Sequence, residues 1–399
     1  MYKLYPYFTN DGSVGLFSPE VDDIYHSTYG ALTEAYEKFI LPADLKNYFE
    51  KKRKIKILDI CFGIGYNTKS FLNFVYNETI GSNNIKHIDK LYGDNMRYKI
   101  FVHAIDTDKN LAYLSPFFIT NKKCRKNNDR LSFKQEKIER MLSNKITAQF
   151  DIKKEINILL LQKLICGVDN EIEAILNAKQ YREYFDKDLL ALYRIKKFEE
   201  CKSTNVRRFI AFLHNIYYHH LSTCYKNVLK AHKLIDFNFK LSIEDARSAL
   251  KCDKNKYNYI FLDAFTPTKC PCLWSVDFFK LLYEHLDDNG MILTYSNSAL
   301  VRNAFLEAGF YVGKIYSQTA EKFRGTLAVK NKTLIKYELS EYDLGLMKTK
   351  AGIFYRDKNL SLDNEAIIAA HKIEVENSNL ISSSKFIKSY KKKSKVIGM

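Results

Sequence analysis

The sequence predicts an α/β fold built on a mostly parallel sheet, with an antiparallel closing pair of strands and a helical insert. Short apolar runs typical of buried strands alternate with segments of helical periodicity. The strand expected at 55–60 leads into the two-glycine turn Gly63-Ile64-Gly65. Glycine and proline number only 15 and 6 in 399 residues, which favours long regular elements over a loop-rich fold.

The expected elements follow one another in a regular order. In the first 50 residues, the turn at 9–13 joins two short strands, and a helix over 30–41 ends at Pro42. After the glycine turn, Thr68, Phe71, Leu72 and Val75 repeat at helical spacing. Further strands are expected at 99–105, 237–243, 257–262 and 290–295, helices at 274–287 and 299–308, and the closing strand pair at 311–317 and 326–330.

We expect three regions along the chain. Residues 1–50 form a strand and helix cap over the active site. Residues 51–330 form the sheet domain, with a basic helical insert at about 115–235. Residues 331–399 form an α-rich appendage that ends in a basic, mobile tail.

The net charge of +17 is concentrated in two segments. Residues 121–240 hold 25 basic and 14 acidic residues, and residues 377–399 hold six lysines and no acid. A solvated helical surface with a disordered tail would explain this charge. A surface that binds a polyanion such as RNA would explain it too, and we favour that interpretation because phosphate contacts draw on Lys and Arg.

Composition argues against a membrane protein, an exported protein and a metal site. No apolar run reaches the roughly 18 residues that a membrane span needs, and the first residues lack an apolar signal core, so we expect a cytoplasmic protein. No C-x2-C pair occurs, and Cys270 and Cys272 are too close in sequence for a tetrahedral zinc site. Neighbouring His219 and His220 would face different ways on a helix. We therefore expect reduced, structural cysteines and no metal.

Acidic residues follow the second, third and fourth expected core strands, and the carboxyl ends of parallel strands share one sheet edge, where ligands bind. An acid after the second strand is placed to bind ribose hydroxyls, and Asp245 to receive an adenine amino group. With the glycine turn, this is the arrangement of an S-adenosylmethionine site in a Rossmann-like class I methyltransferase. A dehydrogenase shares the first two features, but the acids after the third and fourth strands favour the methyltransferase. The acids are Asp106 and Asp108, Asp245, and Asp263.

The loop from Asp263 to Trp274 is the second informative feature. Its sequence is Asp-Ala-Phe-Thr-Pro-Thr-Lys-Cys-Pro-Cys-Leu-Trp, and Pro267 and Pro271 restrict its backbone. A stiff loop that holds an aspartate beside the reacting centre suits substrate positioning. Trp274 is either part of that site or an anchor in the core.

These motifs, in this order, resemble the methyltransferase of tRNA 5-(aminomethyl)-2-thiouridine modification, the MnmC type. The D-x-F-x-P-x-K-x-P-x-x-W loop is the most specific of them. The resemblance covers roughly residues 18–330, in blocks at 22–27, 30–35, 59–68, 103–109, 245–247, 263–274, 305–310 and 324–328.

The resemblance implies a reaction, a cofactor and a partner. The family transfers methyl from S-adenosylmethionine to the primary amine of 5-aminomethyl-uridine at the tRNA wobble position, which gives 5-methylaminomethyl-uridine. Asp263 would be the catalytic residue that orients the amine and receives its proton. Cofactor-binding residues would be Gly63, Gly65, Asn67, Asp106, Asp108 and Asp245, with Asp108 preferred to Asp106 for the ribose. Substrate-binding residues would be Tyr25, His26, Glu34, Phe265, Lys269 and Trp274.

Two departures from the family bear on this interpretation. Many members carry an additional FAD-dependent oxidoreductase domain, whereas this chain shows no second glycine fingerprint. We therefore expect a methyltransferase without oxidoreductase activity, with a separate partner for that step, or a truncated or split protein. The insert is also longer than in most members. Two other interpretations stay open: an aminopropyltransferase that makes polyamines, and a catalytically silent RNA-binding protein of the same fold.

Overall fold

The structure is a computed structural model of the chain. It describes residues 5–19, 23–25, 28–78, 97–120, 122, 142, 147, 149–199, 227–228, 234–318 and 320–396.

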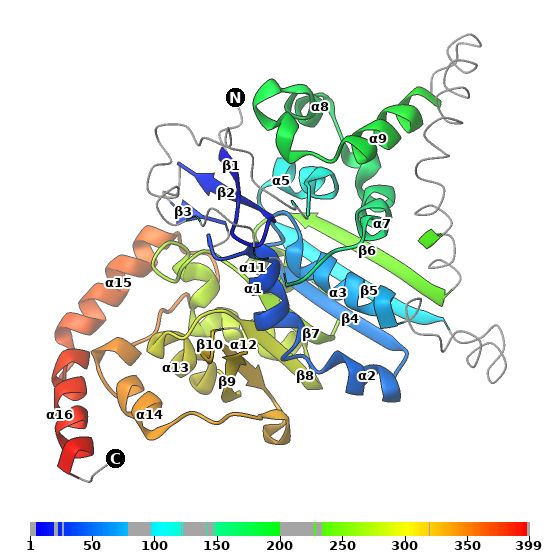
Figure 1. The fold of residues 1–399 in the computed structure, drawn as a ribbon. Coiled ribbons are helices and arrows are strands. Elements are labelled where there is room, and N and C mark those ends of the chain that lie inside the picture. The colour runs from blue at the N-terminus through cyan, green and yellow to red at the C-terminus, as the bar shows by residue number, and fades with distance from the viewer. Residues whose placement is uncertain are drawn as a thin grey trace.

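The described residues form a central sheet of seven strands (Figure 1). The order across the sheet is β6-β5-β4-β7-β8-β10-β9, in which β6 to β8 are parallel neighbours and β10 runs antiparallel to both β8 and β9. This arrangement confirms the predicted α/β fold with its antiparallel closing strand. The strands are β4 (Lys54–Ile60), β5 (Tyr98–Asp106), β6 (Ile235–Ile243), β7 (Tyr257–Leu262), β8 (Leu286–Thr294), β9 (Tyr311–Ser317) and β10 (Lys322–Val329).

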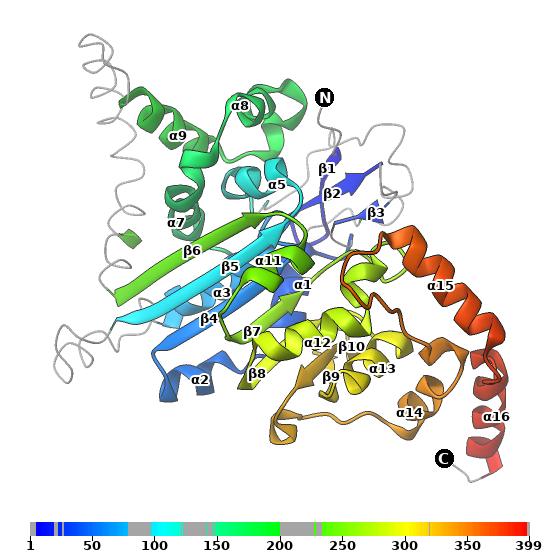
Figure 2. The same cartoon turned by 180° about the vertical axis from the view of Figure 1, so that it is seen from behind.

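Helices cover both faces of the sheet, as the views in Figures 1 and 2 show. Two hydrophobic clusters pack on opposite faces of the sheet. Ile57 of β4 belongs to one and Leu58 to the other, because successive strand residues point to opposite faces. Ile57 shares its cluster with Phe71 of α3, and Leu58 shares the other with Phe279 of α12. The helices here are α3 (Tyr66–Tyr76), α11 (Ala246–Cys252), α12 (Val276–His285) and α13 (Ala299–Glu307).

The N-terminal region forms a small antiparallel sheet and two α-helices beside the main sheet. The expected turn at 9–13 joins β1 (Tyr5–Phe8) to β2 (Val14–Ser18), and β3 (Asp23–Ile24) pairs with β2. Asp11 holds this hairpin to α1, because its Oδ2 accepts hydrogen bonds from the backbone N and Oγ1 of Thr33, both at 2.8 Å. The helices are α1 (Ala31–Ala35), which continues as a π-helical turn (Tyr36–Ile40), and α2 (Leu45–Lys51).

The described part of the insert is helical, as expected. It contains α7 (Lys154–Leu164), α8 (Asn170–Asn177) and α9 (Lys187–Glu199), which follow α5 (Lys109–Leu114). His219 and His220 lie outside the described residues. No described helix is both long and apolar enough to cross a membrane.

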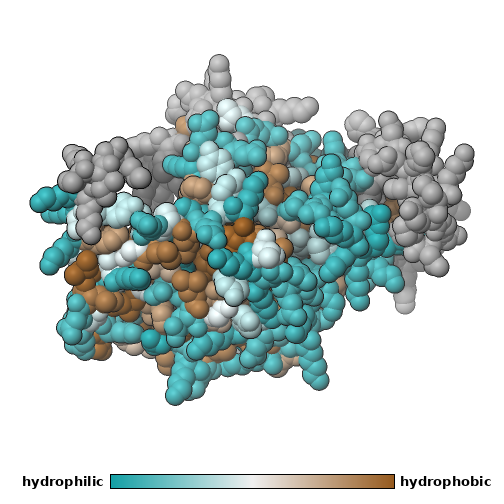
Figure 3. All heavy atoms as spheres, turned by 90° about the horizontal axis from the view of Figure 1, so that it is seen from below, coloured by the Kyte–Doolittle hydropathy of each residue, from teal (hydrophilic) through white to brown (hydrophobic). Residues whose placement is uncertain are grey.

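The C-terminal appendage contains three helices, α14 (Glu341–Met347), α15 (Asn364–Asn377) and α16 (Ser383–Val396). Residues 383–396 were expected in a mobile tail, but they form α16. Aromatic packing holds α16 against α14. The ring centroid of Tyr342 on α14 lies 5.1 Å from that of Tyr390 and 5.9 Å from that of Phe386. Figure 3 shows that hydrophilic side chains cover most of the face seen from below.

Candidate active site

The glycine turn connects β4 to α3 through backbone conformations that favour glycine. Gly63 and Gly65 have φ angles of 55° and 77°. A Cβ atom on Gly65 would lie 2.5 Å from the Cζ of Phe62, so this position has no room for a side chain. The backbone N of Gly63 donates a 2.6 Å hydrogen bond to Oδ2 of Asp106 at the end of β5. The turn is thereby fixed to the neighbouring strand.

A cavity of about 610 Å³ lies at the carboxyl ends of β4, β5, β6 and β7. Its volume falls within the range of small-molecule sites, which is roughly 300–1,000 Å³. The lining comes from the N-terminal region, the strand ends and the C-terminal appendage together. Seven of the predicted site residues line it: Tyr25, Glu34, Gly63, Asp106, Asp245, Asp263 and Phe265.

Asp263 follows β7 and presents a carboxylate to this cavity. The Nδ2 of Asn67 on α3 donates to its Oδ2 at 3.0 Å. Burial raises the pKa of Asp263 to about 6, and the charge of Glu34 adds to this rise, while the Asn67 hydrogen bond and Lys38 lower it. A carboxyl group with this pKa is ionised at neutral pH and can still accept a proton from a positioned group.

Glu34 and Lys38 form an ion pair one helical turn apart, with Nζ of Lys38 2.7 Å from Oε1 of Glu34. Both side chains line the cavity and are largely buried. The Nζ of Lys38 also lies 5.5 Å from the ring centroid of Tyr295, another lining residue. Sequence reasoning missed Lys38 and Tyr295. The i,i+4 spacing of Glu34 and Lys38 was the available signal for the first of them.

The two acids at the carboxyl end of β5 have different roles. Asp106 lines the cavity, and its carboxylate accepts hydrogen bonds from the backbone N of Gly63 and of Asp108. Burial raises its pKa to about 6. Asp108 is absent from the lining, because its carboxylate accepts the backbone N–H of Leu111 at 2.9 Å and caps α5. The geometry therefore favours Asp106, not Asp108, as the acid that faces a ligand.

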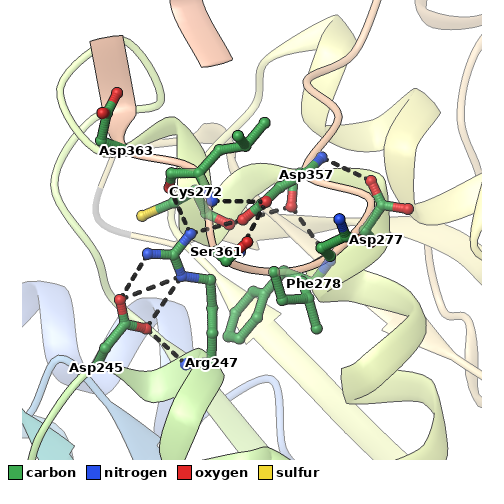
Figure 4. A network of polar contacts seen from close by, with 12 residues as sticks. Asp245, Arg247, Cys272, Asp277, Phe278, Asp357, Ser361 and Asp363 are labelled. Atoms are coloured by element: carbon green, nitrogen blue, oxygen red, sulfur yellow. Dashed lines mark hydrogen bonds and ion pairs between the residues drawn. The ribbon is translucent and has the colours of Figure 1, made fainter. Parts of the chain in front are cut away.

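Asp245 lines the cavity at the end of β6, but it is engaged by Arg247. Figure 4 shows the guanidinium of Arg247 between Asp245 and the segment of the appendage that contains Asp357. The guanidinium lies 2.7 Å from the Asp245 carboxylate and 2.6 Å from that of Asp357, which is fully buried. Asp357 in turn accepts the backbone N–H groups of Ser361 and Leu362. This network brings Asp363 and Asn364 to the cavity wall.

Three predicted residues act behind the cavity instead of in its wall. Trp274 is fully buried, and its indole N–H donates to the carbonyl of Phe265 at 2.8 Å, so the prediction of direct substrate contact is replaced by a role as core anchor of the loop. Asn67 contacts Asp263 from behind the cavity, and Gly65 begins α3.

The remaining substrate-binding predictions have mixed outcomes. The ring of Tyr25 packs edge-on against that of Phe265, with centroids 4.9 Å apart, so these two residues meet at the cavity wall. Lys269 is exposed and is not part of the lining, so the geometry does not support its predicted contact. His26 lies outside the described residues.

The chemistry of the cavity suits a ligand that carries hydroxyl and amino groups, such as a nucleoside. Asp106 and Asp245 offer acceptors for hydroxyl and amino groups at neighbouring strand ends, and Gly63 lets a ligand approach the backbone closely. In the described part of the chain, no group of three His, Cys, Asp or Glu side chains could hold a metal ion.

Comparison with known proteins agrees with this geometry. Residues 205–331 match the family described as S-adenosyl-L-methionine-dependent methyltransferase. The bifunctional protein MnmC of tRNA 5-methylaminomethyl-2-thiouridine biosynthesis from Burkholderia vietnamiensis is 36% identical over 75 residues, which cover 19% of this chain and 12% of that protein. The crystal structure of MnmC2 from Aquifex aeolicus aligns with a TM-score of 0.54 at 19% identity, over 95% of this chain and 87% of that one. Together these matches support an MnmC-type methyltransferase domain in this chain.

The chain also has an archaeal relative. An uncharacterised protein of Methanocaldococcus jannaschii is 34% identical over 133 residues, which span 33% of this chain and 37% of that protein. The matched parts are thus well under half the length of these curated relatives. The likeness to the Aquifex structure extends over nearly the whole chain, and at 19% identity it concerns the fold.

Proposed function

We propose that this chain binds S-adenosylmethionine and transfers its methyl group to the primary amine of 5-aminomethyl-uridine, or its 2-thio form, at the wobble position of tRNA. The observation that carries the proposal is the position of Asp263. Its carboxylate faces the cavity one strand away from the glycine turn, in the loop that most resembles the MnmC type. The name of the Burkholderia relative assigns that protein to the same tRNA modification.

The cofactor would lie along the strand ends. We assign the ribose to Asp106 and the adenine edge to Asp245, with Gly63 giving the backbone room to approach. S-adenosylmethionine supplies a sulfonium methyl group that is already activated. The protein must therefore place the acceptor amine in line with the sulfur–carbon bond and remove a proton.

Asp263 would handle that proton. The amine nitrogen forms a bond to the methyl carbon while the carbon–sulfur bond breaks, its electron pair stays on sulfur, and the nitrogen becomes positively charged. A carboxylate with a pKa of about 6 is ionised at neutral pH, orients the incoming amine and takes up the released proton. Glu34 and Lys38 border the same space, so their charges set how readily Asp263 ionises.

The acceptor nucleoside would enter past Tyr25 and Phe265. These rings meet at the cavity wall, where they can contact the planar base. The loop that holds Phe265 is anchored from behind by Trp274, which keeps the ring and Asp263 in a fixed relation.

Methyl transfer from labelled S-adenosylmethionine to tRNA that carries 5-aminomethyl-uridine, followed by nucleoside analysis, tests this function. The expected product is the 5-methylaminomethyl nucleoside at the wobble position. A labelled polyamine from a polyamine precursor would instead support an aminopropyltransferase. Cofactor binding without transfer to any tRNA would refute the proposed reaction.

A further inference from the structure

We propose that exposed aromatic rings and cations at the tip of the β9–β10 hairpin form a stacking surface for unpaired RNA bases beside the cavity. We name this the hairpin surface; it comprises Tyr29, Tyr316, Lys322, Phe323, Arg324 and Tyr337. The inference rests on the proposed function, because it assigns the nucleotides that flank the reacting one to this surface.

Three rings form the centre of the hairpin surface. Tyr316 and Phe323 are cross-strand partners on β9 and β10, with ring centroids 5.3 Å apart, and Tyr337 lies 5.5 Å from Phe323. Tyr316 and Phe323 are 37% and 38% exposed, and Tyr337 is half-buried. Grouped aromatic side chains that stay exposed mark interaction sites more often than single ones do.

One cation lies next to these rings, and another lies over the ring of Tyr29 in the N-terminal region. The Nζ of Lys314 is 4.3 Å from the ring centroid of Phe323, and the guanidinium of Arg324 is 5.5 Å from that of Tyr29. Lys322, which precedes Phe323 on β10 and pairs with Ser317, is exposed, and Glu321 at the turn is the acid nearest in sequence. Lys314 also pairs with Asp343, at 3.1 Å. The cations nearest the hairpin tip are therefore Lys322 and Arg324.

Topology places the hairpin surface at the same edge of the sheet as the cavity. Because β10 is antiparallel to β8, its first residues lie at the sheet edge where β8 ends. Asn297 bridges the two strands there: its Oδ1 accepts the backbone N–H of Gly325 at 2.7 Å, and its Nδ2 donates to the carbonyl of Phe323 at 3.4 Å. Tyr295, two residues earlier, lines the cavity, and so does Ala31, two residues after Tyr29.

Unpaired RNA is the ligand that this combination fits. Every base has a π-face that stacks on an aromatic ring, and the phosphates between bases meet Lys or Arg. Sequence-tolerant stacking of this kind requires splayed bases, as in the loop of a tRNA arm, and a fully paired duplex does not present them. The net charge of +17 favours a polyanionic partner as well.

Binding measurements with two RNA probes test the inference. The probes are an anticodon stem–loop and a fully paired duplex of equal length, each titrated against the full chain at several salt concentrations. Phe323→Ala is expected to weaken stem–loop binding about tenfold and to leave duplex binding nearly unchanged, and Phe323→Tyr to restore it. Arg324→Glu is expected to make the slope of log affinity against log salt shallower by about 0.7 or more.

Lys52→Glu is the matched control. Its Nζ lies 5.7 Å from the ring centroid of Tyr48, so it is also a lysine over an aromatic ring, but it precedes β4 at the opposite edge of the sheet. It is expected to leave stem–loop binding close to that of the wild type. Calorimetric binding of S-adenosylmethionine shows in each variant whether the chain is folded.

The outcomes separate this inference from the proposed function. Wild-type methyl transfer with unchanged stem–loop binding in both Phe323→Ala and Arg324→Glu would overturn the hairpin surface alone. Weakened binding in these variants without methyl transfer by the wild type would overturn the function alone. Equal losses for the stem–loop and the duplex would also overturn the inference, because they indicate a general polyanion surface without stacking. If Phe323→Ala fails to fold, Phe323→Leu removes the ring at smaller cost.

Discussion

The Nδ2 of Asn67 lies 3.0 Å from the Oδ2 of Asp263 and donates a hydrogen bond to it, so the glycine-turn helix holds the candidate proton acceptor directly. This contact joins the two sequence features that predicted the site. It also changes the role of Asn67, which was expected to bind the cofactor. The amide stabilises the ionised form of Asp263 and lowers its pKa against the effect of burial.

Removal of this hydrogen bond should shift the pH dependence of the reaction. In Asn67→Ala, the pKa of Asp263 rises above its value of about 6, so the acid limb of the kcat/KM profile moves to higher pH. Asn73→Ala is the matched control, because Asn73 is buried on the same helix and bonds to Tyr36 and Asp151 instead. If the acid limb lies at the same pH in Asn67→Ala and in the wild type, Asn67 does not set the pKa of Asp263.

Substitutions of Glu34 and Lys38 should shift the acid limb of the pH profile in opposite directions. Lys38→Met removes a cation that lowers the pKa of Asp263, so the limb moves to higher pH. Glu34→Gln removes an anion that raises this pKa, so the limb moves to lower pH. The measurement is the pH profile of methyl transfer for both variants. Shifts of the same sign would show that the Asp263 carboxylate is not the titrating group.

The contact between Arg247 and Asp357 should couple the appendage to the cofactor cavity. Removing one partner of a buried ion pair leaves the other unpaired, and we expect Arg247→Met to lower the free energy of unfolding by about 3 kcal/mol and to weaken S-adenosylmethionine binding. Calorimetry and thermal unfolding measure both effects. Arg356→Met is the control, since Arg356 pairs with Glu374 on the exposed surface. If Arg247→Met binds S-adenosylmethionine as tightly as the wild type, the appendage does not influence the cofactor site.

The buried carboxyl group of Asp59 should make the free energy of unfolding depend on pH, whether or not the chain is catalytically active. Burial raises its pKa to about 8, so the folded chain holds a proton that the unfolded chain has already released at neutral pH. The stability of the wild type should therefore fall as pH rises from about 5 to about 8. Asp59→Asn should flatten this dependence in denaturant titrations. If the stability of Asp59→Asn still falls with pH as steeply as that of the wild type, other groups cause the dependence.

The sheet and the strand-end site were predictable from sequence because local patterns specify them. The short apolar runs, the glycine turn and the acids at the strand ends each depend on a few neighbouring residues. The choice between Asp106 and Asp108 was not predictable in this way. Asp106 ends β5 and Asp108 lies two residues later, and only the helix that begins at Lys109 decides that Asp108 serves as its cap.

Long-range contacts explain the other differences. Trp274 is an anchor because the core packs around it from distant elements, and no local pattern separates that role from a binding role. The cavity wall at Asp363 and Asn364 depends on Arg247, more than a hundred residues earlier in the chain. Charge composition indicated a basic tail, but the packing of Phe386 and Tyr390 on Tyr342 makes a helix of it.

The rate of methyl transfer by Asp263→Asn to tRNA that carries 5-aminomethyl-uridine tests the central claim most directly. The substitution keeps the shape of the side chain and removes its capacity to accept a proton. We expect the rate to fall by about 10²-fold or more, while S-adenosylmethionine binding measured by calorimetry stays close to that of the wild type. A variant that transfers methyl at the wild-type rate would contradict the assignment of Asp263 as the residue that receives the proton.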